Sequence, residues 1–517
     1  MVLHPERRSS RTAASERMRL FPRYRRGVST VTRGGTPRHA GGEPVSANDL
    51  TILAADRGCA PMNIGAALVV EGGSAVAPGD VLALLRRRSE AVPRLRQRLH
   101  RPPLGGGRPA WVDDPDFDLD DHFAVRVLPE ALGGAQRNAG ATAGLGHAPP
   151  APTDVDDAVL TALAELVCQA LPRDRPLWRS CWITGLPSGD AALVVAVHHV
   201  MTDGQGGLAL LAGLVDEPTT PASQGSPASR RGATASGDHR EQVLDDRRTN
   251  TTSRTRWRTS LQGLRELGLV GSRPHLAPRT SLNRPTGPHR RLSAVAFPLA
   301  RIIEAAHARS CTVNDLVLTA VGGALGQFLA ARGEHPPSLT ISIPVSARPS
   351  GPSSSLGNQT GVAPVVVPAF GDPEVRLAAV VAATRRLHHP GGRVPARRSS
   401  RPGAISHGRG ASSGPLGVAF RALASVGAFQ PFIDHQRLVN TFVTNVRGPA
   451  DPFRLAGHPV SQVVPAAVTP GNVGVTFDVL SYAGGLLISV VSDPRLLPDP
   501  SELLTDLEAE MAWPAVR

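Results

Sequence analysis

The stretch LVVAVHHVMTDGQGG, residues 193–207, joins an apolar run to a polar, glycine-rich turn. The apolar part is typical of a buried strand. His198 and His199 end that run, and Asp203 and several glycines follow them. An imidazole can take up and return a proton near neutral pH, and glycines permit both a sharp bend and the close approach of a bound molecule. The pattern therefore predicts a catalytic histidine at the end of a strand, facing a cavity.

Two histidines and an aspartate could instead hold a metal ion. Because His198 and His199 are adjacent, their side chains would point to opposite faces of a strand and would not share one ion. The sequence offers no clear third ligand, so we expect no metal site. A second pair, His388 and His389, lacks the Asp-Gly that follows the first pair, and we assign it no role.

Length and charge narrow the class of protein. A chain of 517 residues is too long for one ordinary core. The net charge of +13 favours anionic partners, such as acidic lipid headgroups or coenzyme A. We expect no nucleic acid partner, because zinc-finger spacing and aromatic-rich basic modules are absent. The four cysteines form no CxxC pair, no secretory signal is evident, and the apolar runs are short for a membrane helix. We therefore expect a cytoplasmic protein that can touch a membrane surface.

Composition divides the chain into four segments. Residues 1–44 are Arg-rich and read as a disordered tail. Residues 45–216 form a first lobe that carries the histidine pair. Residues 217–280 form a low-complexity linker and crossover. Residues 281–517 form a second lobe, with a disordered insertion at 389–414. Helix and strand patterns alternate in both lobes, which predicts the α/β class, and SCWITGL and AALVVAV predict a hairpin at 180–197.

The sequence HHVMTDG, residues 198–204, resembles the HHxxxDG signature of coenzyme-A-dependent acyltransferases and peptide-synthetase condensation domains. Further stretches, in the right order over about residues 45–493, resemble the bacterial wax ester synthase/diacylglycerol acyltransferase family. These stretches are SANDLTILAADRGCAPMNIGAALVVEG (46–72), PRLRQRL (93–99), DRPLW (174–178), TSLNRPTGPHRR (280–291), TVNDLVLTAVGGAL (312–325), IPVSAR (343–348), LGNQTG (356–361), TNVRGP (444–449) and VLSYAGGLLISVVSD (479–493).

The resemblance implies two lobes like those of chloramphenicol acetyltransferase, with an active-site tunnel between them. It implies that His199 is the general base that deprotonates a lipid alcohol, whose oxygen then attacks the thioester of acyl-CoA. His198 would support the loop, and Asp203 would orient it. Gly204 would leave room for substrate.

Four further residues have two interpretations each. The resemblance places Asn314 and Asp315 beside the active-site channel, but Thr312 and Asp315 also fit a helix capping box. It places Thr444 and Asn445 along the acyl-CoA channel, but they also end a predicted strand where a turn-forming asparagine is common.

The implied function is transfer of a fatty acyl group from acyl-CoA to diacylglycerol, which makes triacylglycerol, or to long-chain alcohols, which makes wax esters. Acyl-CoA would be a co-substrate, with no permanently bound cofactor. The protein would associate peripherally with the inner face of the plasma membrane or with lipid droplets. Two alternatives remain: a catalytically degenerate protein that binds lipid droplets or membrane surfaces, and a condensation-domain-like acyltransferase that uses carrier-bound acyl groups.

Overall fold

The computed structural model describes residues 42–56, 58–102, 108–129, 155–216, 276–346, 360–388, 428–468 and 471–512. The interpretations of residues 1–41, 217–275 and 389–414 therefore lie outside the described residues. Two predicted boundaries need correction. Residues Glu43 and Pro44, assigned to the tail, form strand β1, which pairs with strand β4 (Ala110–Asp113). Ala277, assigned to the linker, is a buried residue of the folded part.

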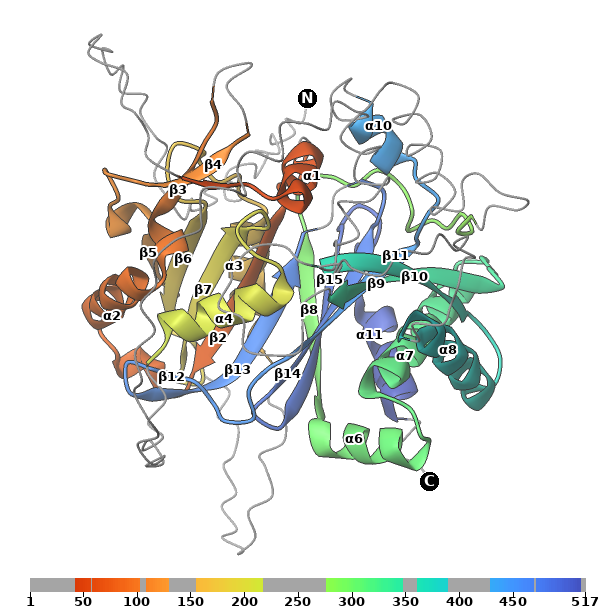
Figure 1. Cartoon of the computed structure of the whole chain (residues 1–517). Helices are drawn as coiled ribbons and strands as arrows, with labels where there is room; N and C mark the ends of the chain where they lie inside the picture. Colours follow the sequence, from red (N-terminus) through yellow and green to blue (C-terminus); the bar gives the residue numbers. More distant parts are fainter. Residues whose placement is uncertain are drawn as a thin grey trace, which may run out of the picture.

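The described residues form two large sheets and one small sheet (Figure 1). The remaining strands are β2 (Asn63–Val70), β3 (Gln97–His100), β5 (Phe123–Val127), β6 (Trp178–Thr184), β7 (Ala191–His198), β8 (Arg291–Pro298), β9 (Ser338–Ser346), β10 (Thr360–Pro368), β11 (Thr441–Arg447), β12 (Arg454–Leu455), β13 (His458–Ala467), β14 (Val475–Tyr482) and β15 (Gly485–Ser492). The helices are α1 (Ala47–Ala55), α2 (Pro78–Ala91), α3 (Asp157–Val167), α4 (Gly204–Leu214), α6 (Leu299–Ala308), α7 (Val313–Ala331), α8 (Pro373–His388), α10 (Phe429–Asp434) and α11 (Ser501–Ala512).

The N-terminal lobe is built on a sheet in the order β12-β13-β2-β7-β6-β5. The predicted hairpin is confirmed, because β6 and β7 pair in antiparallel fashion. Strand β7 is buried along its whole length, which is why its sequence is a continuous apolar run. Residues Leu193, Val195 and Val197 pack with the core that includes α2 and α4, while Ala192, Val194 and Ala196 pack with the core that includes α3.

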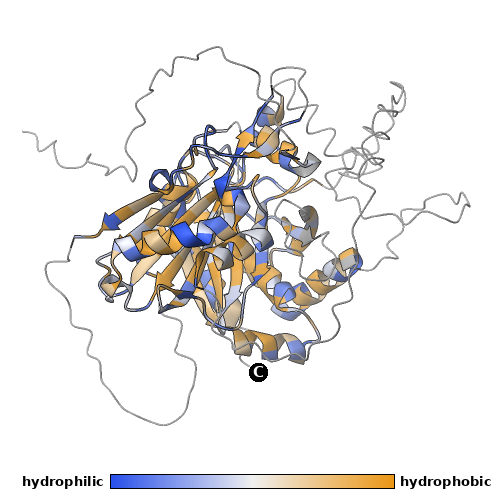
Figure 2. Ribbon diagram, turned by 60° about the vertical axis from the view of Figure 1, so that its left-hand side comes forward, coloured by the Kyte–Doolittle hydropathy of each residue, from blue (hydrophilic) through white to orange (hydrophobic). Residues whose placement is uncertain are grey.

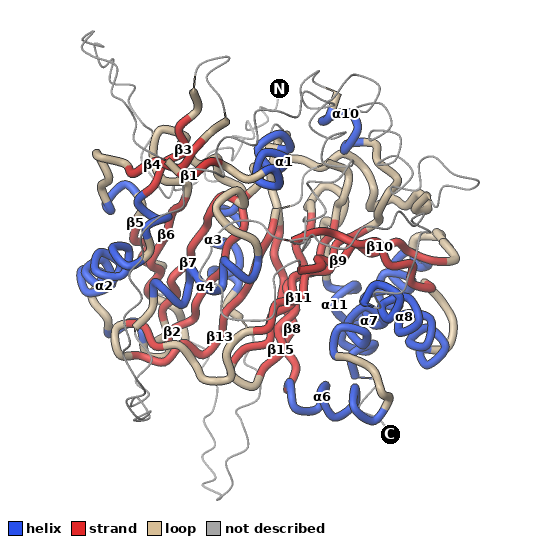
Figure 3. The backbone as a smooth tube through the Cα atoms, in the orientation of Figure 1, coloured by secondary structure: helices blue, strands red, loops and turns tan. Residues whose placement is uncertain are grey.

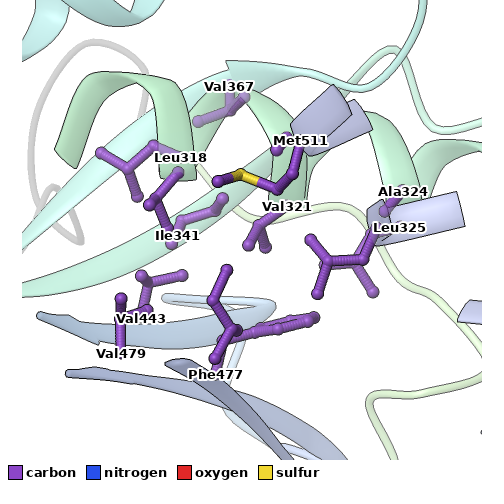
Figure 4. Close-up of a cluster of buried hydrophobic side chains, with 14 of the residues drawn as sticks. Leu318, Val321, Ala324, Leu325, Ile341, Val367, Val443, Phe477, Val479 and Met511 are labelled. Carbon is purple, nitrogen blue, oxygen red and sulfur yellow. The ribbon is translucent and has the colours of Figure 1, made fainter. Parts of the chain in front are cut away.

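The C-terminal lobe has a sheet in the order β10-β9-β11-β14-β15-β8. Its core helix α7 begins with the predicted capping box, in which Thr312 and Asp315 bond each other's backbone amides. Helix α7 is long and apolar enough to span a membrane by length and composition, but 78% of that segment is buried within the protein. It is thus the central helix of the lobe. Figure 4 shows its side chains Leu318, Val321 and Leu325 packed over strand residues of the same core.

Strands β12 and β13 belong to the N-terminal sheet, although they come late in the chain. Strand β13 pairs antiparallel with β2 from Ile64 to Val70. The assignment of residues 281–517 to the C-terminal lobe alone is therefore wrong for these two strands. Figures 1 and 3 show the result: the strands of the two lobes run across the middle of the molecule, with helices on the flanks. Figure 2 shows that hydrophobic residues concentrate on these central strands.

Candidate active site

His199 lies in the turn that follows β7, and two hydrogen bonds fix it. Its backbone N–H donates to the Met62 carbonyl at 2.8 Å. Its ring Nδ1 lies 2.9 Å from the carbonyl oxygen of Thr202. A carbonyl can only accept, so Nδ1 carries the proton and Nε2 carries the lone pair. His199 is therefore held in the tautomer in which Nε2 can act as a base.

His198 occupies the other side of the strand end, as the alternation of side chains predicts. It is 3% exposed. Its Nδ1 accepts a hydrogen bond from the Val200 N–H at 3.0 Å, so Nε2 carries the proton and donates to Asp56 at 3.1 Å. Burial lowers the pKa of His198 despite the opposing effect of Asp56, so the ring stays neutral. His198 thus stabilises the turn and does not face the same space as His199.

Asp56 completes this support. Burial would raise the pKa of the Asp56 carboxyl, but the hydrogen bond from His198, the Met62 N–H and the Arg173 guanidinium together lower it. The Met62 N–H donates to Asp56 at 2.9 Å, and Arg173 forms an ion pair with the same carboxylate. Because the Met62 carbonyl also accepts from His199, Asp56 indirectly orders the backbone that holds both histidines.

Asp203 caps helix α4. Its Oδ1 accepts from the Gly206 N–H at 2.9 Å, and its own carbonyl accepts from the Gly207 N–H at 2.7 Å. An N-terminal aspartate also interacts favourably with the positive end of the helix dipole. Gly204, the first helical residue, approaches the second lobe closely: a Cβ there would lie 3.1 Å from Val446. Asp203 therefore orients the turn that carries His199, and Gly204 keeps the gap between the lobes open.

A cavity of about 130 Å³ lies between the lobes at His199. Its wall is mostly apolar and comes from β2, β7, α4, β11, β13 and β14. Gly204, Thr444 and Asp478 contribute to it together with His199. Pockets for drug-sized ligands measure about 300–1,000 Å³, so this cavity is smaller than a pocket that holds a whole ligand of that size. That the cavity continues as a tunnel through the molecule stays a prediction.

Thr444 and Asp478 lie side by side on the C-terminal wall, in register on the parallel strands β11 and β14. Thr444 Oγ1 lies 2.6 Å from Asp478 Oδ1, and the Ala467 N–H donates to Asp478 Oδ2 at 2.8 Å. Burial raises the pKa of Asp478 to about 6, although both of these hydrogen bonds lower it. The wall opposite His199 therefore carries a carboxyl group that changes its charge near neutral pH.

Asn445 and Asn314 lie behind this wall. The Asn445 amide donates to Asn314 Oδ1 at 3.3 Å, at the start of α7. Successive residues of a strand face opposite sides, and Figure 4 shows Val443 and Val479 directed to the α7 side of the sheet. Thr444 thus faces the cavity and Asn445 faces α7. The structure does not bring all the predicted substrate-binding residues together.

Asp315 caps the N-terminus of helix α7. One carboxylate oxygen is 2.8 Å from Thr312 Oγ1 in the capping box, and the other accepts from Thr384 Oγ1 of α8 at 2.7 Å. Asp315 is 4% exposed and does not contribute to the described cavity wall. Its contacts are those of a residue that caps α7 and fastens α8 to it.

Sequence reasoning missed Asp56 and Asp478. Asp478 has a signal in hindsight: it is a lone acidic residue in the apolar strand sequence VGVTFDVLSY, and a charged residue is rarely buried without a partner. Asp56 follows the end of α1, and its pairing with His198 spans 142 residues, so no local pattern reveals it.

Among the described residues, no group of three or more His, Cys, Asp and Glu side chains could hold a metal ion. The expectation that the protein uses no metal stays a prediction, since the remaining segments lie outside the described residues.

Comparisons with known proteins show which family the chain matches. Residues 45–137 and 147–317 match the "Wax ester synthase/diacylglycerol acyltransferase catalytic domain", and residues 356–513 match the "WS/DGAT C-terminal domain". The Mycobacterium tuberculosis protein named "Probable diacyglycerol O-acyltransferase tgs1" is 28% identical over 463 residues, which cover 87% of this chain and 90% of that protein.

Solved structures show the same fold. The wax ester synthase/diacylglycerol acyltransferase from Marinobacter aquaeolei VT8 aligns with a TM-score of 0.58 at 20% identity, over 92% of this chain and 99% of that chain. The starter condensation domain of rhizomide synthetase aligns with a TM-score of 0.53 at 17% identity, over 92% and 94% of the two chains. The two-lobed fold predicted from the sequence is thereby confirmed, and the chain belongs to the wax ester synthase/diacylglycerol acyltransferase family of acyltransferases.

Proposed function

We propose that the protein transfers a fatty acyl group from acyl-CoA to the hydroxyl of diacylglycerol, with long-chain alcohols as a second class of acceptor. One observation carries this proposal: the Thr202 carbonyl holds His199 in the tautomer with a basic Nε2, and His199 lines an apolar cavity between the lobes. A lipid hydroxyl and a fatty thioester are the reactants that such a cavity suits. The name of the Mycobacterium tuberculosis relative supports diacylglycerol as the acceptor.

The reaction begins when His199 Nε2 removes the proton from the acceptor hydroxyl. The hydroxyl oxygen attacks the thioester carbon, and the carbonyl electron pair moves onto its oxygen. The tetrahedral intermediate then collapses, the carbon–sulfur bond breaks, and the departing thiolate takes the proton from His199. The products are an ester and free coenzyme A, and no covalent acyl-enzyme forms.

The residues around His199 keep the base in place. The neutral His198 ring donates to ionised Asp56, which fixes the end of β7. Asp203 fixes the start of α4. Neither group faces the reacting atoms, so both act by positioning His199 and the backbone around it.

We also propose that acyl-CoA enters as a co-substrate and that the protein works at a lipid surface, at the inner face of the plasma membrane or on lipid droplets. Both proposals rest on chemistry: the acceptor is a membrane lipid, and the chain carries a net charge of +13 that favours acidic lipid headgroups and the phosphates of coenzyme A. Flotation with vesicles of neutral or acidic phospholipid tests the surface, with binding to acidic vesicles as the expected result.

The first test is acyl transfer from radiolabelled palmitoyl-CoA to diacylglycerol, hexadecanol or a long-chain amine. His199→Ala should lower kcat by about 100- to 10,000-fold, since this is the range of general-base catalysis. The matched control is His307→Ala, which replaces an exposed histidine on α6 and should leave the rate unchanged. An unchanged rate in His199→Ala would contradict the mechanism. Transfer to the amine alone would favour chemistry of the condensation-domain type.

A further inference from the structure

We propose that Asp478 and Thr444 form a hydrogen-bond switch, in which the protonated Asp478 turns the Thr444 hydroxyl hydrogen toward the thioester oxygen. Thr444 would then stabilise the oxyanion of the tetrahedral intermediate. This inference rests on the proposed acyl transfer at His199 and adds a pH-controlled donor on the opposite wall of the same cavity.

The two oxygens of Asp478 have different partners. Oδ2 faces the Ala467 N–H at 2.8 Å, and a backbone amide can only donate. Oδ2 is therefore always an acceptor, so a proton on Asp478 must reside on Oδ1. Oδ1 lies 2.6 Å from the Thr444 hydroxyl, which can either donate or accept. The protonation of one carboxyl oxygen thus sets the direction of one hydrogen bond.

Two states follow from this geometry. When Asp478 is ionised, Thr444 must donate its hydrogen to Oδ1. When Asp478 is protonated, Oδ1–H donates to Thr444 Oγ1, and the Thr444 hydrogen is directed elsewhere. Thr444 contributes to the cavity wall, so its hydroxyl hydrogen can find a new hydrogen-bond acceptor in a molecule bound in the cavity. A thioester oxygen that gains negative charge is such an acceptor, and a preorganised donor stabilises it strongly.

Among the described residues, few titratable or charged groups surround Asp478 and could change its protonation. His199 and Asp478 are the two titratable residues on the cavity wall, as far as the described residues go. Ser489 lies directly opposite Asp478 on β15, and Thr444 and Ala467 are its neighbours on β11 and β13; none of these three carries a charge. Burial is the main reason why the pKa of Asp478 rises to about 6. An acyl chain in the cavity would exclude water and favour the protonated form further.

The switch adds no reactant to the chemistry. The proton on Asp478 stays on Asp478 throughout, and the transferred proton still passes from the acceptor hydroxyl to His199 Nε2 and then to the thiolate. Thr444 only donates a hydrogen bond to the oxygen that becomes negative, and this bond weakens when the carbonyl re-forms.

The experiment is a comparison of pH–rate profiles of kcat/KM between pH 5 and 9. His199 must be neutral in every variant, so the informative quantity is kcat/KM of the wild type divided by that of Asp478→Asn. This ratio should fall as the pH rises through about 6, because wild-type Asp478 ionises and recaptures the Thr444 hydrogen, whereas the asparagine amide donates to Thr444 at every pH and cannot ionise. Thr444→Val should lose about 100- to 1,000-fold below pH 6, where wild-type Thr444 donates to the oxyanion, and much less at higher pH, where ionised Asp478 already holds the Thr444 hydrogen. Thr444→Ser should keep the wild-type profile.

The matched control is Thr476→Val, which makes the same chemical change two residues from Asp478 on the same face of β14. Thr476 Oγ1 is buried and has no hydrogen-bond partner among the described residues, so its loss should leave the profile unchanged. A ratio of wild type to Asp478→Asn that stays constant through pH 6, or a full rate in Thr444→Val below pH 6, would overturn the switch. If Asp478→Asn fails to fold, the Thr444→Ser and Thr444→Val profiles still decide. If the wild type transfers no acyl group to any acceptor, the proposed function fails and not the switch alone.

Discussion

Asp478→Asn should stabilise the folded protein above pH 6, and the size of the effect follows from its buried position. Asp478 is 3% exposed, and its pKa is raised by burial from the model-peptide value of 3.8 to about 6. A group whose pKa is raised on folding contributes stability that is fully present below pH 3.8 and is lost as the pH rises through about 6. Keeping Asp478 ionised in the folded state therefore costs about 3 kcal/mol.

The asparagine side chain removes this cost and preserves the local contacts. Its carbonyl can accept from the Ala467 N–H, and its amide can donate to Thr444, so both hydrogen bonds of Asp478 have replacements. We therefore expect the variant and the wild type to be equally stable at pH 3.5. At pH 8 the variant should be more stable by up to about 3 kcal/mol.

Urea denaturation followed by circular dichroism, at several pH values from 3.5 to 8, measures this difference directly. The comparison isolates Asp478, because all other carboxyl groups titrate in both proteins. The reasoning would be refuted by a stability difference that is independent of pH, or by a wild type that is the more stable protein at pH 8.

Two further substitutions test the geometry around the site and the core. Asp203→Ala should destabilise the protein by about 1 kcal/mol, the usual loss of a helix N-cap, and should slow acyl transfer, whereas Asp203→Asn should largely preserve both stability and rate. Urea denaturation measures the stability and a steady-state assay measures kcat. An unchanged kcat in Asp203→Ala would show that α4 does not position His199. Gly326→Ala should destabilise by about 1–3 kcal/mol through overpacking, because the added Cβ would overlap the Ala369 carbonyl; Gly79→Ala on α2, where a Cβ meets nothing within 4 Å, is the control. Thermal denaturation measures the pair, and equal melting temperatures would mean that α7 has room to shift.

Local signals in the sequence predicted the local parts of the site. The apolar run before His198 predicted a buried strand, and the spacing of Thr312 and Asp315 predicted the capping box of α7; the structure has both. These features depend on residues a few positions apart, which is why composition and periodicity suffice for them. The orientation of His199 was also within reach, because adjacent strand residues face opposite sides.

Contacts between distant segments could not be predicted in the same way. Asp56 reaches His198 across 142 residues, and β13 inserts beside β2 although Ile64 and Ala467 are just over four hundred positions apart. A strand shows from its own sequence that it will pair, but not with which partner. The placement of Thr444 and Asn445 along one channel stays a prediction, although alternation along β11 directs the two side chains to opposite faces and Asn445 bonds Asn314.

The insertion of β13 into the first sheet has a consequence for how reactants come and go. Swinging the lobes apart would strain the chain that leads from β13, paired with β2 in the first sheet, to β14 in the second, and would expose the core that Leu487 and Val491 of β15 share with Ala466 of β13. The two lobes are thus covalently and sterically joined along the side where β13 lies. The fatty chains of both reactants and of the product therefore have to enter and leave between lobes that stay joined on this side.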